Sequence, residues 1–265
     1  MNNAILAHIK TLPPLPESVV KIQTICSDPN SGVADLAKVI ENDPMLTANL
    51  LKAANSPLYG FSREIKTLAQ AVSLFGMATV RGFALAGAVR STLKIDLSPY
   101  RLDAEQFAGL SQLQNALMLK WFGQINRTML DVLSPASFLT NVGRVIIAQE
   151  IVKNGNMEAF IRQCERGGVE SAEIEMLDIS YQEVSAEMFR QWRFEEAIVN
   201  AISFSRCPEE AVSPVKEHAE ALHVVQAAVL TPGGITQNSI SKASEIAGGY
   251  GLSPELFTKA ASQFI

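Results

Sequence analysis

Residues 43–90 read DPMLTANLLKAANSPLYGFSREIKTLAQAVSLFGMATVRGFALAGAVR, and the three helices that they predict decide the fold. Asp43 can accept hydrogen bonds from the free amide groups of a first helical turn, and Pro44 suits the first helical position because an N–H there would have no intrahelical partner. Apolar residues then recur at spacings of three and four, so one face of a short helix is apolar. That helix is expected to end near Asn55, because Pro57 disfavours helical geometry at the residue before it.

Two further helices follow in the same stretch. Thr67 can cap the first of them, and Gly76 ends it before the second begins. Helical spacing of apolar residues continues beyond Asp103 to the C-terminal tail, and it includes an almost wholly apolar helix expected to start at Ser134-Pro135. No alternation typical of strands persists anywhere. The periodicity therefore predicts an all-α protein.

The composition is that of an ordinary globular chain. Its 265 residues are 48% hydrophobic and 18% charged, which is enough for a buried core. A polar connector at residues 94–103 predicts a boundary between two closely packed helical lobes, residues 1–92 and 103–265. No apolar run approaches the roughly 18 residues of a membrane span, and the N-terminus lacks the basic residues of a secretory signal. Three cysteines far apart in sequence fit reduced thiols, so a cytoplasmic protein without membrane insertion is expected.

Charge is divided unevenly along the chain. Residues 1–103 carry ten basic and eight acidic side chains, whereas residues 104–265 carry 12 basic and 19 acidic ones, and the whole chain has a net charge of −5. The carboxylates of residues 170–175 are expected on a solvated face. An acidic chain without a basic helix has few cations with which to displace counterions from phosphates. Nucleic acid is therefore not an expected partner.

A set of short motifs in the first third of the chain carries a family resemblance. They are Leu12-Pro13-Pro14-Leu15-Pro16, Ile40-Glu41-Asn42-Asp43-Pro44, Leu50-Leu51, Ala54-Asn55-Ser56, Tyr59-Gly60, Ile65, Ala71-Val72 and Leu74-Phe75-Gly76. With these motifs in register, the chain resembles the HDOD family, the bacterial output-module relatives of the HD phosphohydrolases. The resemblance extends over one continuous module at about residues 12–208. It implies an HD-like multi-helix bundle and a role in bacterial signal transduction.

The resemblance also indicates where a catalytic centre would lie. HD phosphohydrolases are named for an adjacent His-Asp pair, which helps to bind the divalent metal that activates water. The three histidines, His8, His218 and His223, are not followed by Asp. In the resemblance, Thr140 and Asn141 occupy the place of the pair, and neutral oxygen and amide groups are weak ligands for divalent transition metals. A non-catalytic module that holds no metal or other cofactor is therefore expected.

The loop that begins at Asn55 is the candidate interaction surface. Asn55 and Ser56 can donate and accept hydrogen bonds to a partner, Tyr59 offers a flat contact surface, and Arg63 offers a charge. The alternative is that Asn55 and Ser56 bond their own helix end, as turn residues of these types usually do, and that Tyr59 packs on the neighbouring lobe.

Binding of signalling proteins by a stand-alone module is the expected function, and a homodimer stays open. Two alternatives remain. The first is a degenerate HD phosphohydrolase or phosphodiesterase that binds metal through carboxylates. The second is a sensor that holds a nucleotide or cyclic dinucleotide between the lobes without hydrolysis. The carboxylates of the first alternative are Asp131, Glu150 and Asp178. The arginines of the second are Arg63, Arg81 and Arg90.

Overall fold

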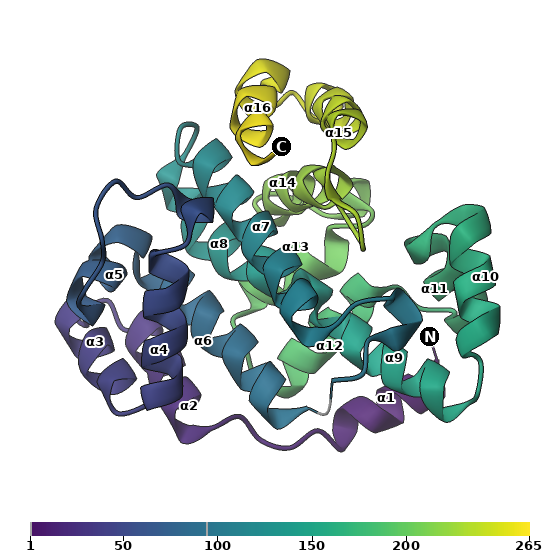
Figure 1. Ribbon diagram of the computed structural model, residues 1–265, viewed down its shortest axis with the longest axis horizontal. Coiled ribbons are helices and arrows are strands. Elements are labelled where there is room, and N and C mark those ends of the chain that lie inside the picture. The colour runs from purple at the N-terminus through teal and green to yellow at the C-terminus, as the bar shows by residue number, and fades with distance from the viewer. Residues whose placement is uncertain (1, 94) are drawn as a thin grey trace. The chain divides into compact units, whose positions relative to one another are not determined.

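The computed structural model describes residues 2–93 and 95–265, which form two compact units built almost wholly of α-helices (Figure 1). The smaller unit is Pro14–Thr92. The larger unit combines Met1–Pro13 with Leu93–Ile265. The all-α prediction is confirmed. The first helix, α1 (Asn3–Lys10), contacts helices of the larger unit, whereas the predicted lobe boundary placed it with residues 14–92.

The smaller unit contains five α-helices within the described residues. They are α2 (Glu17–Ser27), α3 (Val33–Glu41), α4 (Pro44–Ala54), α5 (Leu68–Phe75) and α6 (Met77–Thr92). The caps are those that the sequence predicts: Asp43 Oδ1 accepts from the Leu46 amide at 3.0 Å, and Thr67 and Gln70 bond each other's backbone in a capping box. Gly76, with φ of 79°, ends α5. Their buried apolar faces form a core of their own.

The larger unit adds further helices and a small hairpin. The helices are α7 (Ala104–Phe122), α8 (Leu130–Leu139), α9 (Gly143–Lys153), α10 (Met157–Gly167), α11 (Val169–Leu177), α12 (Tyr181–Gln191), α13 (Glu196–Phe204), α14 (Val215–Ala228), α15 (Gln237–Gly249) and α16 (Pro254–Ala261). Strands β1 (Val229–Leu230) and β2 (Gly234–Ile235) pair antiparallel. Two-residue strands are too short to show alternation, which is why the sequence did not predict them. Helix α7 packs against α8, α12 against α9 and α13, and α14 against α13 and α15 (Figure 1).

The expected helix start at Ser134-Pro135 is wrong. Helix α8 begins at Leu130 and runs through Pro135, although proline removes one helical hydrogen bond, and its side chains from residue 133 onward are buried. The apolar stretch then breaks at the 3₁₀ turn Thr140–Val142, before α9. Burial overrides the local proline signal here, and the break comes from contacts made elsewhere in the chain.

Gly143 shows what causes the break. A Cβ atom at this position would lie 2.3 Å from the Tyr181 carbonyl oxygen and 2.7 Å from the Ser185 nitrogen. The Gly143 amide donates to Ser185 Oγ at 2.7 Å, and Ser185 Oγ donates to the Thr140 carbonyl at 2.6 Å. The start of α12 therefore presses directly on the α8–α9 junction, and only glycine leaves room for it.

Among the described residues, one helical segment is long and apolar enough to cross a membrane by length and composition alone. It is residues 127–153, where polar residues interrupt the apolar runs and 83% of the most apolar window is buried inside the protein. The bent pair Leu68–Phe75 and Met77–Val89 passes the same test only as a broken span. Such burial is typical of a core helix.

Candidate functional site

Thr140 and Asn141 lie buried at the α8–α9 junction, and both side chains bond protein groups. Thr140 Oγ1 donates to the Ala136 carbonyl at 2.7 Å, within its own helical turn. Asn141, which is 1% exposed, donates from Nδ2 to Gln114 Oε1 at 2.9 Å. Its Oδ1 accepts from Arg144 Nη1 at 2.7 Å. Protein donors and acceptors therefore use the polar atoms that the resemblance places at the catalytic pair.

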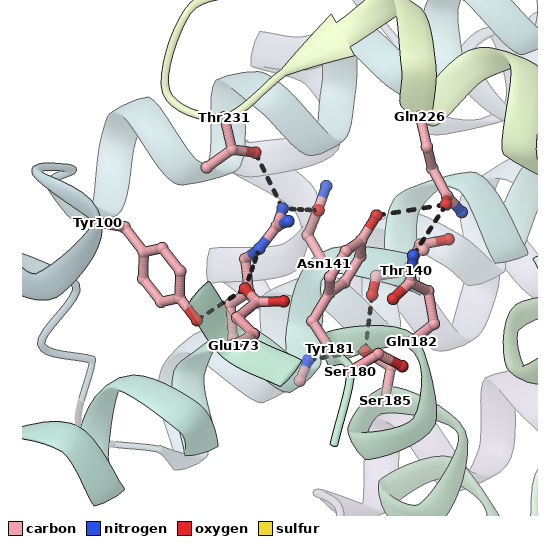
Figure 2. Close-up of polar contacts among 12 residues, drawn as sticks. Tyr100, Thr140, Asn141, Glu173, Ser180, Tyr181, Gln182, Ser185, Gln226 and Thr231 are labelled. Atoms are coloured by element: carbon pink, nitrogen blue, oxygen red, sulfur yellow. Dashed lines mark hydrogen bonds and ion pairs between the residues drawn. The ribbon is translucent and has the colours of Figure 1, made fainter. Parts of the chain in front are cut away.

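Arg144 is a cation held inside the larger unit. It is 5% exposed, and its Nε donates to Glu173 Oε1 at 2.9 Å, while Nη1 also donates to Thr231 Oγ1 at 2.9 Å (Figure 2). The Tyr100 hydroxyl donates to the same Glu173 oxygen at 2.9 Å. The guanidinium carbon lies 3.7 Å from the centre of the Tyr181 ring. A buried charge of this kind needs both its counter-ion and its hydrogen bonds.

Burial perturbs the titration of the groups around Arg144. It raises the pKa of the Glu173 carboxyl, and the neighbouring Arg144 guanidinium and its hydrogen bond offset this only in part. Burial raises the pKa of the Tyr100 hydroxyl well above its usual value, and the nearby Glu173 carboxylate adds to the effect. Tyr181 follows the same pattern, with burial again the largest cause of its raised pKa. Both phenols therefore stay protonated and act as hydrogen-bond donors.

A second chain of hydrogen bonds runs from α12 to α14. The Tyr181 hydroxyl and Gln182 Nε2 both donate to Gln226 Oε1, at 3.2 and 3.3 Å (Figure 2). Gln226 Nε2 donates onward to Ser205 Oγ at 2.9 Å. His223 Nδ1 lies 2.8 Å from the Ser205 carbonyl oxygen, which only accepts, so Nδ1 carries the proton. Gln182 Oε1 is buried and has no partner among the described residues.

These groups line a cavity of about 390 Å³ in the larger unit. Its polar wall includes Arg144, Gly168, Gln182, Arg206, His223 and Thr231. The volume falls in the range of small-molecule sites, roughly 300–1,000 Å³. The cavity thus combines a fixed guanidinium, histidine and amide acceptors, and the start of a helix.

The family follows from a comparison of the whole sequence. A model of the HDOD domain matches residues 12–208. The chain belongs to the HDOD family. The match covers all of the smaller unit, Pro14–Thr92, and it continues into the larger unit to the end of α13.

Solved structures share the HDOD fold at low sequence identity. A proposed phosphohydrolase from Shewanella amazonensis is 20% identical with a TM-score of 0.70, over 99% of this chain and 94% of that one. A proposed signal transduction protein from Marinobacter aquaeolei is 22% identical with a TM-score of 0.69, over 96% of this chain and 57% of that one. A virulence factor from Campylobacter jejuni is 27% identical with a TM-score of 0.58, over 100% and 96%.

One curated relative is an uncharacterised protein of Treponema pallidum. It is 24% identical over an alignment of 223 residues that covers 78% of this chain and 40% of the relative. The HDOD chain thus spans about two fifths of the length of that relative.

The carboxylates predicted for a degenerate metal site in this HDOD protein do not meet. Within the described residues, no three His, Cys, Asp or Glu side chains form a group that could hold a metal ion, so Asp131, Glu150 and Asp178 are not brought together. Glu150 is buried and accepts from Asn154 Nδ2 at 2.8 Å. Asp178 ends α11 with φ of 54°.

The loop from Asn55 is held mainly by its own bonds. Asn55 Nδ2 donates to the Leu51 and Ile65 carbonyls at 2.9 Å, and its Oδ1 accepts from the Ile65 amide at 2.8 Å. Ser56 Oγ accepts from the Leu58 amide. The Asn55 side chain therefore connects the end of α4 to the backbone at Ile65, in the segment that precedes α5.

Tyr59 and Arg63 differ in their surroundings. The Tyr59 ring packs edge-on against Phe75 at 4.7 Å between centroids and near Phe83 at 6.0 Å, all within the smaller unit. Arg63 is exposed and lines a second cavity, of about 510 Å³, with Phe61 and Leu74. Of the four candidate residues, Arg63 is the one with an exposed side chain at a cavity.

The arginines predicted for a nucleotide sensor also differ among themselves. Arg63 is exposed, whereas Arg81 is 5% exposed in the interior of the smaller unit. The side chain of Arg90 lies outside the described part of the structure. Arg144 and Arg206, which do line the cavity of the larger unit, were missed.

Glu173 is the clearest correction to the sequence analysis. It was expected on a solvated face, but it is fully buried against Arg144. The sequence contains one signal for a buried carboxylate: Arg144 lies inside an apolar stretch, and a buried arginine requires a buried counter-ion. Nothing in the local sequence identifies the rest of this network. Glu173 lies 29 residues from Arg144 in the sequence, and Tyr100 lies 73 residues from Glu173, to which it donates.

Proposed function

We propose that this HDOD chain is a non-catalytic regulatory module in bacterial signal transduction, and that it acts by binding a protein partner. The bonding at the α8–α9 junction carries the proposal. Asn141 is bonded on both sides, to Gln114 and to Arg144, and the guanidinium is a fixed positive charge beside it. A divalent metal at that place would have to displace these bonds and overcome repulsion from the guanidinium.

Family membership supports the signalling role. The HDOD domain covers most of the chain, and the Marinobacter aquaeolei protein of the same fold is a proposed signal transduction protein. The Shewanella amazonensis neighbour is a proposed phosphohydrolase, so the fold by itself does not decide between regulation and hydrolysis. The chemistry of the junction favours regulation.

The cavity of the smaller unit is the surface that we propose for partner binding. Phe61 and the half-exposed Leu74 supply apolar contact area, and Arg63 and Glu64 supply charges at the same cavity. Leu74 is 49% exposed, whereas the larger apolar side chains of the same helix, Leu68, Val72 and Phe75, are buried. The arrangement suits a peptide that inserts one apolar side chain and places an acidic group near Arg63.

Site-directed photo-crosslinking in the native host tests this function. A photo-crosslinking amino acid at position 74 should give a discrete adduct with one protein, and the added substitution Arg63→Glu should abolish it. Position 212, where Val is 79% exposed in the larger unit, serves as the control. Equal adducts from positions 74 and 212, or an adduct unaffected by Arg63→Glu, would refute binding at this surface.

A further inference from the structure

We propose that the cavity lined by Arg144, Gln182, Arg206 and His223 binds a small organic phosphate, with the phosphate at the start of α11. The site lies entirely within the larger unit. The inference goes beyond the proposed function and does not depend on it.

The start of α11 supplies the place for the phosphate. Gly168 precedes the helix with φ of 87°, and among the described residues no side chain caps it. The amides of Val169, Glu170 and Ser171 come first in the helix and have no intrahelical acceptor, and all three residues line the cavity. Unpaired amides and the helix dipole together favour an anion there.

Gln182 independently indicates a ligand with hydrogen-bond donors. Its side chain is 1% exposed and lies in the cavity wall, where Nε2 is used by Gln226. Its Oε1 finds no donor in the part of the chain that the structure describes. A buried acceptor without a partner is costly, so a donor from a bound molecule would remove that cost.

His223 presents a second acceptor in the same wall. Because Nδ1 donates to the Ser205 carbonyl, Nε2 of the neutral ring carries a lone pair. Inorganic phosphate can accept hydrogen bonds from the amides at the start of α11, but it has few donors for these two acceptors. An organic phosphate with N–H or O–H groups at its other end satisfies both sides of the cavity.

The charges at the cavity rim allow an anion to enter. Arg206 Nε pairs with Glu170 Oε1 at 3.2 Å, and both side chains are 43% exposed. Exposed pairs of this kind contribute little to stability, so Arg206 can exchange Glu170 for a phosphate at small cost. Arg144, whose guanidinium is held by Glu173, Asn141 and Thr231, lies in the wall of the same cavity.

Isothermal titration calorimetry of the full chain tests the site, with inorganic phosphate and guanosine 5′-monophosphate as probes. Guanosine 5′-monophosphate carries donors on the base and the ribose, so we expect it to bind at least about tenfold more tightly than inorganic phosphate. Gln182→Met removes the unpaired acceptor. It should lower the affinity for the nucleotide and leave that for inorganic phosphate unchanged.

Two substitutions at the rim should act in opposite directions. Glu170→Gln removes a competing carboxylate and should tighten both probes, whereas Arg206→Glu should weaken both, each by roughly fivefold for a half-exposed charge. Glu158 and Arg162 form an exposed ion pair on α10 outside the cavity lining. Glu158→Gln and Arg162→Glu therefore make the same charge changes as matched controls.

Binding of neither probe at millimolar concentration would overturn the proposal. Equal effects of the rim variants and the α10 controls would also overturn it, because the charge dependence would then be that of the whole protein. Near-ultraviolet circular dichroism of Gln182→Met establishes that a lost signal is not lost folding.

Discussion

At the scale of single residues, Arg144 and Glu173 form a buried ion pair that connects α9 to α11. Their bonded atoms are 2.9 Å apart, and the exposed fractions of the side chains are 6% and 0%. Two charges in such a place stabilise the fold only as a pair, because either one alone keeps its desolvation cost without compensation. The consequences of removing one partner are therefore larger than those of removing both.

Arg144→Leu should destabilise the protein by about 3–5 kcal/mol at neutral pH, because Glu173 is left as an unpaired buried carboxylate. Removal of the guanidinium takes away the main influence that lowers the pKa of Glu173, while burial still raises it and the Tyr100 hydroxyl still lowers it, so this pKa, already raised from 4.5, rises further. A carboxyl with a raised pKa in the folded state stabilises the fold below its unfolded pKa, and this contribution is lost as pH rises through the folded pKa. The deficit of the variant should thus be small where Glu173 is protonated in both states, and it should grow as pH rises towards neutrality.

Urea unfolding at several pH values measures this deficit. The double variant Arg144→Leu/Glu173→Gln, which has no carboxylate to ionise, should show a weaker dependence on pH. A deficit in Arg144→Leu that is equal at low and high pH would contradict the assignment of an ionised Glu173.

Gly143 offers a second test at the residue scale. Gly143→Ala places a Cβ against the Tyr181 carbonyl and Ser185, so we expect a loss of about 1–3 kcal/mol or more in thermal or urea unfolding. Gly109, inside α7, has nothing within 4 Å of an added Cβ. Gly109→Ala should therefore stabilise the helix by roughly 0.5–1 kcal/mol, and equal behaviour of the two variants would argue against the close approach of α12.

At the scale of elements, helices set by local signals agree with the sequence analysis. The starts predicted at Asp43 and Thr67 and the end predicted at Gly76 match those observed for α4 and α5, because caps, glycine stops and apolar spacing act within a few residues. The α8–α9 break was missed, since it depends on Ser185 and Tyr181 more than 40 residues away. The place of Thr140 and Asn141 came from family resemblance, but their bonding partners could be found only from the tertiary structure.

The loop between α4 and α5 yields a prediction about its elements. Asn55→Ala removes three hydrogen bonds to Leu51 and Ile65, so it should destabilise the smaller unit by about 1–2 kcal/mol. Hydrogen exchange of the amides in α4 and α5 should report the loss. Arg63→Ala, a substitution of an exposed side chain in the same loop, should leave exchange unchanged. Faster exchange in Arg63→Ala but not in Asn55→Ala would contradict the structural role of Asn55 and favour a role in partner binding.

At the scale of the whole molecule, the fold is shared with a proposed phosphohydrolase, and in this chain a network of buried polar side chains forms hydrogen bonds among its own members. The buried network joins α7, the 3₁₀ turn after α8, α9 and α11 through Gln114, Asn141, Arg144 and Glu173. Such a network fixes the relative positions of these helices, which suits a module that presents surfaces to partners. Under the proposed function, the chain regulates without metal-dependent chemistry.

The most direct test is the metal content of protein purified without a metal-affinity tag, measured by inductively coupled plasma mass spectrometry. Because the Asn141 amide is bonded on both sides and Arg144 is fixed beside it, we predict less than about one-tenth of an equivalent of iron, manganese or zinc. Close to one equivalent of any of them, retained after dialysis, would contradict a non-catalytic module and would make metal-dependent hydrolysis the activity to assay.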